Sequence, residues 1–231
     1  MALSAATSGA MRVLVTGVPK KLPAGLWCYR VDASRSLLGG ALNDVGRAIS
    51  WLTAILQISP EFDLNESLLA RPEPDTPLVL PFFSGERSTG WAADARTIFS
   101  GVSATTAAML FRGTVEGVAV SYARIAEQLH DVAGETRQIL ASGRITQDLP
   151  ALLQVLADVL QTQVIPVIMK RVTLRGTALV SLDVLAPNVD RAEPVVGETR
   201  WPIRDRASYD AARSRHFQDL YDAVLATPTD R

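Results

Sequence analysis

Residues 111–168 read FRGTVEGVAVSYARIAEQLHDVAGETRQILASGRITQDLPALLQVLADVLQTQVIPVI. Apolar residues recur at steps of four and three from Phe111 to Leu129, which is the spacing of one face of an α-helix. A short apolar run at 138–141 then predicts a buried strand, residues 152–160 predict another helix, and 164–168 predict another strand. Because strands and helices alternate, the stretch predicts an α/β fold.

The same alternation extends outward in both directions. Upstream, we expect strands at 11–16, 26–31 and 78–83, with a helix at 45–56 that starts after Gly39 and Gly40. Four prolines between residues 57 and 77 predict a loop there. Downstream, we expect helices at 174–185 and 217–224. No linker is long or biased enough to divide the chain, so we predict one domain over residues 1–231.

Composition excludes several classes of protein. The 231 residues include 48% hydrophobic side chains, which excludes disorder as the main state. Lys+Arg total 23 and Asp+Glu total 24, so no positive excess would drive nucleic-acid binding. The apolar run 164–169 is too short to span a membrane. Cys28 is the single cysteine and cannot form an internal disulfide, which favours a reducing, cytoplasmic compartment.

Three short segments combine small residues with hydroxyls at the ends of expected strands. They are Thr7-Ser8-Gly9-Ala10, Leu38-Gly39-Gly40-Ala41 with Gly46 beyond it, and Ala141-Ser142-Gly143. Such turns let backbone N–H groups and hydroxyls approach an anion closely, although each segment alone is also ordinary turn chemistry. Ligands of open α/β sheets bind beyond the strand ends, so the three together indicate a nucleotide site. No Gly-Lys-Ser/Thr loop or dinucleotide fingerprint is present.

Taken in order, the segments resemble the C-terminal domain of the FGGY family of carbohydrate kinases, and most of all its gluconate kinase-like members. The resemblance runs through nearly the whole chain. Its segments are TSGAMRV (7–13), GGALNDVGRAISWL (39–52), PFFSGERSTGWAADAR (81–96), RGTVEGVA (112–119), residues 141–160 and RGTAL (175–179).

This resemblance implies a ribonuclease H-like, actin-type ATPase domain, one of the two that form a kinase. It implies ATP with Mg²⁺ as cofactor and phosphoryl transfer to a sugar hydroxyl. The Thr7-Ser8-Gly9 turn would contact the phosphates. Gly46 would line the nucleotide pocket, and Gly143 would sit against the adenosine.

The departures from the family pattern bear on activity. The family's catalytic aspartate lies in a Gly-Asp motif just before the phosphate turn, and this chain begins six residues before Thr7. We therefore expect the catalytic aspartate and the N-terminal sugar-binding domain to be absent, and we assign no catalytic and no metal-ligating residue. Ala6 and Arg144 each stand where the family has glycine, and Met109 stands at a usually polar position.

Three functions remain open at this point. The chain is a C-terminal kinase half that is inactive without a separate N-terminal half, a degenerate nucleotide-binding or regulatory module, or a structural relic. Four charged residues in the 81–96 segment invite a catalytic role, but we expect turn hydrogen bonds and helix caps from them; they are Glu86, Arg87, Asp94 and Arg96.

Overall fold

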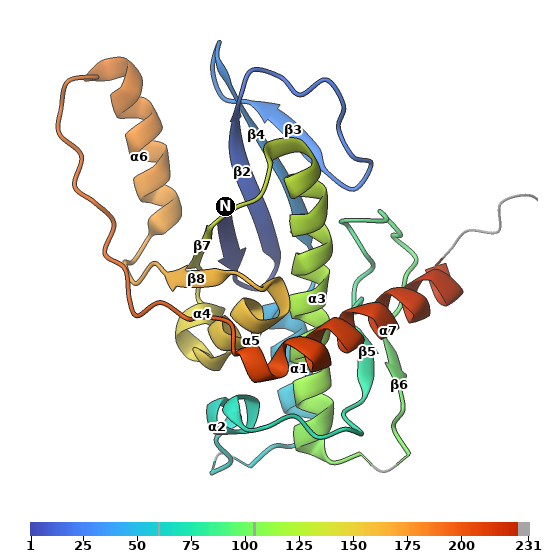
Figure 1. Ribbon diagram of the computed structural model, residues 1–231. Helices are drawn as coiled ribbons and strands as arrows, with labels where there is room; N and C mark the ends of the chain where they lie inside the picture. Colours follow the sequence, from blue (N-terminus) through green and yellow to red (C-terminus); the bar gives the residue numbers. More distant parts are fainter. Residues whose placement is uncertain (60, 104, 226–231) are drawn as a thin grey trace, which may run out of the picture.

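The computed structural model describes residues 1–59, 61–103 and 105–225, and its centre is a six-stranded mixed sheet (Figure 1). The strand order is β3-β4-β2-β1-β7-β8. The first four strands in this order pair antiparallel, whereas β1, β7 and β8 run parallel. The bounds are β1 Ala2–Ala5, β2 Gly9–Thr16, β3 Trp27–Arg30, β4 Arg35–Leu42, β7 Gln138–Ser142 and β8 Gln163–Pro166, with a separate pair of β5 Leu78–Leu80 and β6 Ile98–Ser100.

The helices follow the strands as an α/β pattern requires. Their bounds are α1 Gly46–Ile55, α2 Leu64–Leu69, α3 Ala107–Ala133, α4 Ile145–Asp148, α5 Ala151–Leu160, α6 Val172–Leu185 and α7 Ala207–Leu225, with a 3₁₀ turn at Arg204–Arg206. Thr106 caps the start of α3 by accepting a hydrogen bond from the Met109 N–H at 3.2 Å. Gly134, at φ 77°, ends α3.

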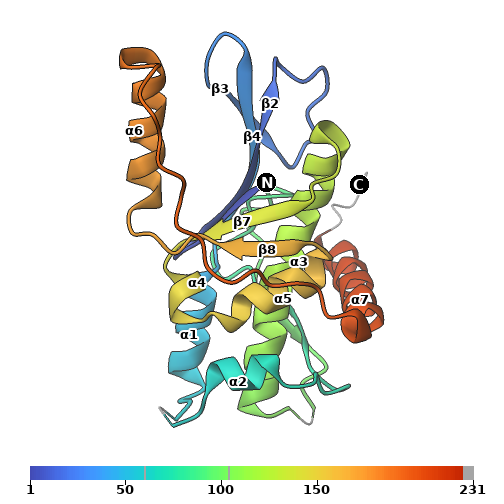
Figure 2. The same ribbon diagram turned by 60° about the vertical axis from the view of Figure 1, so that its left-hand side comes forward.

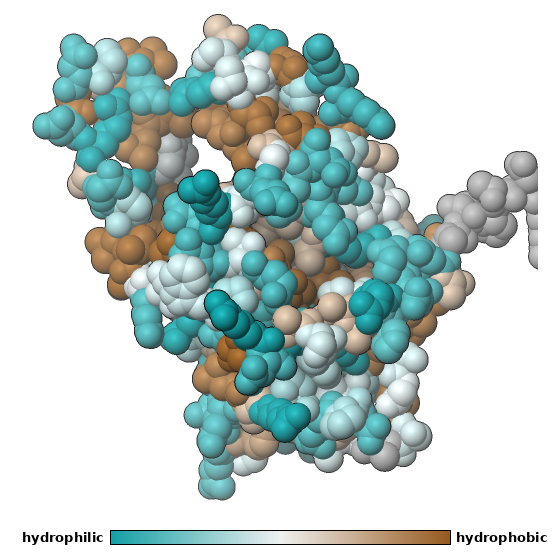
Figure 3. All heavy atoms as spheres, in the orientation of Figure 1, coloured by the Kyte–Doolittle hydropathy of each residue, from teal (hydrophilic) through white to brown (hydrophobic). Residues whose placement is uncertain are grey.

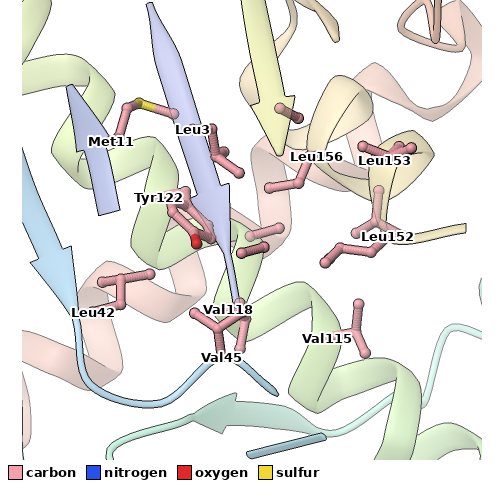
Figure 4. Packing of buried hydrophobic residues seen from close by; sticks show 14 of the residues in the cluster. Leu3, Met11, Leu42, Val45, Val115, Val118, Tyr122, Leu152, Leu153 and Leu156 are labelled. Carbon is pink, nitrogen blue, oxygen red and sulfur yellow. The ribbon is translucent and has the colours of Figure 1, made fainter. Parts of the chain in front are cut away.

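The main core lies where α3 and α5 cover one face of the sheet (Figure 4). Leu3 of β1, Val118 of α3 and Leu156 of α5 are buried there. Tyr122 is fully buried and donates its hydroxyl to the Ser4 carbonyl at 2.7 Å. Burial raises the pKa of Tyr122, so the phenol stays neutral and fixes α3 under β1.

Most of the expected elements are confirmed, with shifted ends. The largest difference is β4, because residues 35–42 form a central strand instead of leading into a helix. A Cβ on Gly39 would lie 2.5 Å from the Trp27 ring, and one on Gly40 would lie 2.8 Å from the Ile125 side chain. The two glycines therefore permit close packing within the sheet, and our interpretation of 38–41 as a ligand-binding turn is wrong.

Helix α2 lies inside the expected loop 57–77. Asp63 caps it by accepting hydrogen bonds from the N–H groups of Asn65 and Glu66 at 2.8 and 3.1 Å. At its other end, Arg112 of α3 donates to the carbonyls of Leu68 and Ala70 at 3.0 and 2.9 Å. The helix is short, and these tertiary bonds to α3 stabilise it. The prolines do not prevent it, since they lie outside its six residues.

Helix α6 confirms the periodicity of 174–185 but has no buried residue. It stands apart from the sheet, as two views show (Figures 1 and 2). Val184 and Leu185 are 80% and 81% exposed. In Figure 3, hydrophobic residues are visible on the lobe that α6 forms at the upper left. Exposed apolar surface of this kind is typical of interaction sites.

Helix α7 packs over α3 and α5 through a buried polar cluster. Glu116 forms an ion pair with Arg213 at 2.9 Å, and Asp158 accepts from the backbone N–H of Ile203 at 2.7 Å. Asp210 lies beside them with its Oδ2 unpartnered among the described residues. Burial, with repulsion from the Asp158 and Glu116 carboxylates, raises the pKa of Asp210 to about 7 despite the nearby guanidinium groups of Arg206 and Arg112.

This cluster predicts a pH-dependent stability. A carboxyl whose pKa is higher in the folded state contributes stability at low pH, and that contribution is lost as the pH rises through about 7. We expect the free energy of unfolding to fall between about pH 4, the ordinary pKa of an aspartate, and pH 7, and Asp210→Asn to remove on the order of 2 kcal/mol of that fall. Urea unfolding at several pH values measures it. Asp219→Asn, an exposed change on the same helix, should keep the wild-type slope. An unchanged slope in Asp210→Asn would contradict the assignment.

Candidate functional site

The turn between β1 and β2 is fastened to the start of α1. The Ala6 carbonyl accepts from the Gly46 N–H at 2.8 Å, and the Thr7 carbonyl accepts from the N–H groups of Val45 and Arg47 at 3.2 and 3.1 Å. These bonds satisfy N–H groups that a helix start leaves free. The side chain of Thr7 takes no part in this bonding, and its hydroxyl has no hydrogen bond to any described residue.

The β1–β2 turn, the start of α1 and the end of β7 meet at one corner of the fold. Two of the predicted glycines are required by the packing of this corner. A Cβ on Gly46 would lie 2.7 Å from the Ala6 carbonyl oxygen and 2.7 Å from the Ile145 side chain. Gly143 has φ +117°, and a Cβ there would lie 2.2 Å from the Ala5 carbonyl oxygen. Gly46 and Gly143 therefore bring α1 and the end of β7 against the β1–β2 turn.

Gly9 has a comparable role at the other end of the turn. A Cβ on Gly9 would lie 2.0 Å from the Tyr122 hydroxyl, which is hydrogen-bonded to Ser4. The space beside these glycines is thus occupied by other groups of the protein and not by a ligand. It sets the shape of the surface on which a ligand would rest.

Two hollows flank the turn. The α1–α4 hollow has a volume of about 660 Å³ and is lined by Ala6, Thr7, Gly46, Arg47, Ser50, Trp51, Arg144, Ile145 and Asp148. The sheet–α6 hollow has a volume of about 870 Å³ and lies between the strands and the start of α6; Ser8, Gly9 and Gly143 are among its lining residues. Both volumes are in the range of small-molecule sites.

All five predicted site residues therefore border a hollow, two on one side of the turn and three on the other. Arg144 and Asp148 line both hollows and form an ion pair at 2.9 Å. The Arg144 side chain is 83% exposed, so the guanidinium stands at the mouth instead of filling the space where the family has glycine. Hydrogen bonding to Asp148 raises the pKa of Arg144 further.

The residues that complete the α1–α4 hollow were not predicted from the sequence. Arg47, Ser50 and Trp51 come from α1, and the Trp51 ring lies 4.8 Å from the Phe83 ring between centroids. Their signal was their place within 39–52, where Arg47 follows Gly46 directly and Ser50 and Trp51 lie four and five positions after it. A turn of an α-helix brings residues three to five positions beyond the N-terminus to the side of the same groove.

The 81–96 segment anchors the corner. Glu86 is buried and accepts hydrogen bonds from the Thr89 N–H at 3.0 Å, Arg124 at 3.1 Å and the Tyr221 hydroxyl at 2.7 Å. Asp44 is buried and accepts from the Ser84 N–H at 2.7 Å. The structural role expected for Glu86 is confirmed.

The other charged residues of the segment differ from Glu86. Among the described residues, the Arg96 side chain donates only to the adjacent Ala95 carbonyl, at 3.0 Å. Arg87 and Asp94 have no side-chain hydrogen bond or ion pair within the described residues, so the turn and cap role expected for them is not seen there. Arg87 instead lines the sheet–α6 hollow.

The described residues form no cluster of metal-ligating side chains at the candidate site. Among residues 1–59, 61–103 and 105–225, no group of three or more His, Cys, Asp or Glu side chains is placed to hold one. The carboxylate that lines the α1–α4 hollow, Asp148, is engaged by Arg144. In the same described ranges, no helix has the length and apolar character needed to cross a membrane.

The mixed sheet and the solved structures that superimpose on it define the fold class, which is ribonuclease H-like and actin-type. Gluconate kinase from Lactobacillus acidophilus superimposes with a TM-score of 0.86 at 23% identity, over 98% of this chain and 47% of its own. Plasmodium falciparum glycerol kinase, solved with ADP, gives a TM-score of 0.75 at 20% identity, over 100% of this chain and 47% of its own.

Sequence comparison then gives the family. Residues 1–182 match the C-terminal domain of the FGGY family of carbohydrate kinases, and the chain belongs to this family. Gluconokinase from Bacillus subtilis (strain 168) is 24% identical over 226 residues, which cover 90% of this chain and 44% of that enzyme. The chain thus spans about half the length of this curated relative.

Proposed function

We propose that residues 1–231 form the nucleotide-binding C-terminal domain of an ATP-dependent carbohydrate kinase, which transfers a phosphoryl group to a sugar or sugar-acid hydroxyl. The observation that carries the proposal is the gathering of Thr7, Ser8, Gly9, Gly46 and Gly143 around one turn between two hollows. The glycerol kinase solved with ADP supports a nucleotide ligand. The gluconokinase and gluconate kinase relatives support a sugar-acid acceptor.

The residues present fit ATP. The hydroxyls of Thr7 and Ser8 suit phosphate oxygens, and the α1–α4 hollow offers Gly46 and Trp51 as surfaces for a flat base. ATP would supply the phosphoryl group. Mg²⁺ would be carried by the ATP phosphates, because the carboxylate at this hollow, Asp148, is already paired with Arg144.

ATP binding by the chain tests this proposal. Isothermal titration calorimetry with Mg-ATP should give measurable heat, and Thr7→Val should weaken the affinity at least fivefold, since one hydrogen bond to a charged phosphate is lost. Thr16→Val, an exposed change of the same kind at the far end of β2, should change the affinity less than twofold. If Mg-ATP gave no heat and no thermal stabilisation, the chain would be a structural relic, and the proposal would be contradicted.

We propose further that the chain needs an N-terminal kinase half, on the same or a separate polypeptide, for turnover. A kinase needs a base within hydrogen-bond reach of the acceptor hydroxyl, and the one carboxylate among the residues lining the α1–α4 hollow is the paired Asp148. The apolar residues of α6, with Val184 and Leu185 the most exposed, offer a contact surface for that half. A cytoplasmic location belongs to the same proposal and rests on the single cysteine, Cys28.

Activity assays separate this proposal from its alternative. The chain alone should not phosphorylate gluconate, whereas it should copurify with the N-terminal half of a gluconokinase and regain turnover. Val184→Glu with Leu185→Glu should abolish the copurification, and Val18→Glu, another exposed apolar site, should not. Turnover by the chain alone would contradict the proposal. ATP binding without any regained turnover would favour a degenerate regulatory module, to which Ala6 and Arg144 also point.

A further inference from the structure

A third hollow, which we call the edge hollow, lies at the other end of β7 and β8 from the β1–β2 turn. It has a volume of about 620 Å³ and is lined from the amino ends of these two strands and from the connection between α6 and α7. β7 and β8 run parallel to β1, whose carboxyl end leads into the turn, so their amino ends point away from it. The edge hollow shares no lining residue with the two hollows beside the turn.

The edge hollow carries positive charge without a counter-charge. Arg137 and Arg204 line it, and neither side chain forms an ion pair or a hydrogen bond within the described residues. No carboxylate is among the lining residues, and Asp205, the next residue after Arg204, is not one of them. Glu198, in the same connection, is paired with Arg200 at 3.3 Å. Unpaired cations on a concave surface attract anions, because the low-dielectric walls focus their field.

The end of α5 does not explain these two arginines. A helix C-terminus carries partial negative charge, which a nearby basic side chain often neutralises. Here the carbonyl groups at the helix end are already bonded. The Asp158 carbonyl accepts from the Gln161 N–H at 3.4 Å, and the Leu160 carbonyl accepts from the Thr162 hydroxyl at 3.1 Å. The two guanidinium groups therefore remain available to a ligand.

A tryptophan ring stands beside the arginines on an ordered backbone. Trp201 is 63% exposed, and its indole N–H has no hydrogen bond within the described residues. Its carbonyl accepts from the Gln154 amide at 2.8 Å, and the preceding Arg200 exchanges two backbone hydrogen bonds with Val164 of β8, at 2.8 and 2.9 Å. The connection that carries Trp201 thus runs along the edge of β8 (Figure 2). Tryptophan and arginine are the residue types that most often dominate the binding energy of protein interfaces.

The remaining polar groups of the edge hollow suit a peptide backbone. The NH₂ groups of Gln161 and Gln163 are bonded to backbone carbonyls of this chain, which leaves their amide oxygens to accept from a peptide N–H. We propose that the edge hollow docks an extended acidic segment of a partner protein, with carboxylates on Arg137 and Arg204 and an apolar side chain on the Trp201 ring. The inference depends neither on ATP binding nor on the contact proposed for α6.

Fluorescence anisotropy with a fluorescein-labelled, C-terminally amidated peptide of sequence EELEE tests the proposal on the whole chain at low salt. The double change Arg137→Gln, Arg204→Gln should weaken binding at least tenfold, because two charge-assisted contacts are lost. Both side chains are exposed, so the variant should fold. The matched control is Arg30→Gln, Arg215→Gln, which removes two exposed arginines outside the hollow and should change the affinity less than twofold.

Further variants and probes identify the class of ligand. Trp201→Ala should weaken binding of the peptide at least fivefold, and Trp201→Phe less than twofold, since phenylalanine keeps an aromatic surface. The neutral peptide QQLQQ should not bind. Thr7→Val, which is expected to weaken ATP binding, should bind EELEE as the wild type does.

Four results would overturn the proposal: absence of EELEE binding, an equal loss in the Arg30 and Arg215 control, an unaltered affinity in Trp201→Ala, or equal affinity for QQLQQ. A short single-stranded DNA that bound more tightly and displaced the peptide would overturn the assignment to a protein partner. A loss of peptide affinity in Thr7→Val would overturn a site separate from the β1–β2 turn.

Discussion

Replacing Gly143 by alanine should destabilise the fold by about 3–5 kcal/mol. Two effects add at this position. The φ of +117° is one that L-residues rarely adopt, which costs of the order of 1–3 kcal/mol. The new Cβ would also lie 2.2 Å from the Ala5 carbonyl oxygen, so β1 or the end of β7 must move. Both strands belong to the parallel centre of the sheet, where little displacement is possible.

Urea unfolding followed by circular dichroism measures this effect. Gly176→Ala is the matched control, since nothing lies within 4 Å of the position that its Cβ would take and the residue is inside α6. This change should be neutral or stabilise by up to about 1 kcal/mol, because alanine is the better helix former. Similar stabilities for Gly143→Ala and Gly176→Ala would show that the β1–β2 corner is far more adaptable than its geometry indicates.

Replacing Arg124 by methionine should cost about 3–5 kcal/mol, the range found when one partner of a buried ion pair is removed. Arg124 lies 3.1 Å from Glu86 and 3.6 Å from the centroid of the Tyr221 ring. Without the guanidinium, the Glu86 carboxylate remains buried with only the Tyr221 hydroxyl and the Thr89 N–H as donors. The 81–96 segment and α7 should loosen together.

Limited proteolysis and urea unfolding report on these two consequences. Cleavage within 81–96 should become faster in Arg124→Met, and the urea midpoint should fall. Arg200→Met removes an exposed pair with Glu198, whose side chain is 78% exposed, and should change stability by less than about 0.5 kcal/mol. If Arg124→Met were as stable as Arg200→Met, the Glu86 contacts would contribute nothing to the fold.

The fold class was predictable from the chain, because α3 follows a strict apolar period and lies before two short apolar runs that form strands. The family was predictable from the resemblance of motif segments such as 39–52 and 81–96. The central strand β4 was not, since Gly39 and Gly40 are typical of turns. Their use in a strand depends on Trp27 and Ile125, which occupy the space where side chains would be. Such tertiary contacts leave no local trace in the sequence. The short strands β1 and β6 have too few residues to show a period.

The five candidate site residues were proposed from the chain, and the structure places them around one turn, where each borders a hollow. The sequence could not predict the charged lining of the sheet–α6 hollow, on the other side of that turn. The cations of the sheet–α6 hollow are spread from Arg12 to Arg171, and only the folded topology places them together. Likewise, the separation between the exposed Arg87 and the buried Glu86, adjacent in sequence, depends on which side of the loop faces Arg124.

The bonds from Ala6 and Thr7 to the start of α1 have a consequence for ligand affinity. Since these backbone groups are held by three hydrogen bonds, the turn has little conformational entropy left to lose when a ligand docks. Flexible phosphate loops lose such freedom on binding, and that loss subtracts from affinity. Here the turn is already ordered in the folded chain. The free energy of ligand binding therefore carries only a small cost for ordering this segment.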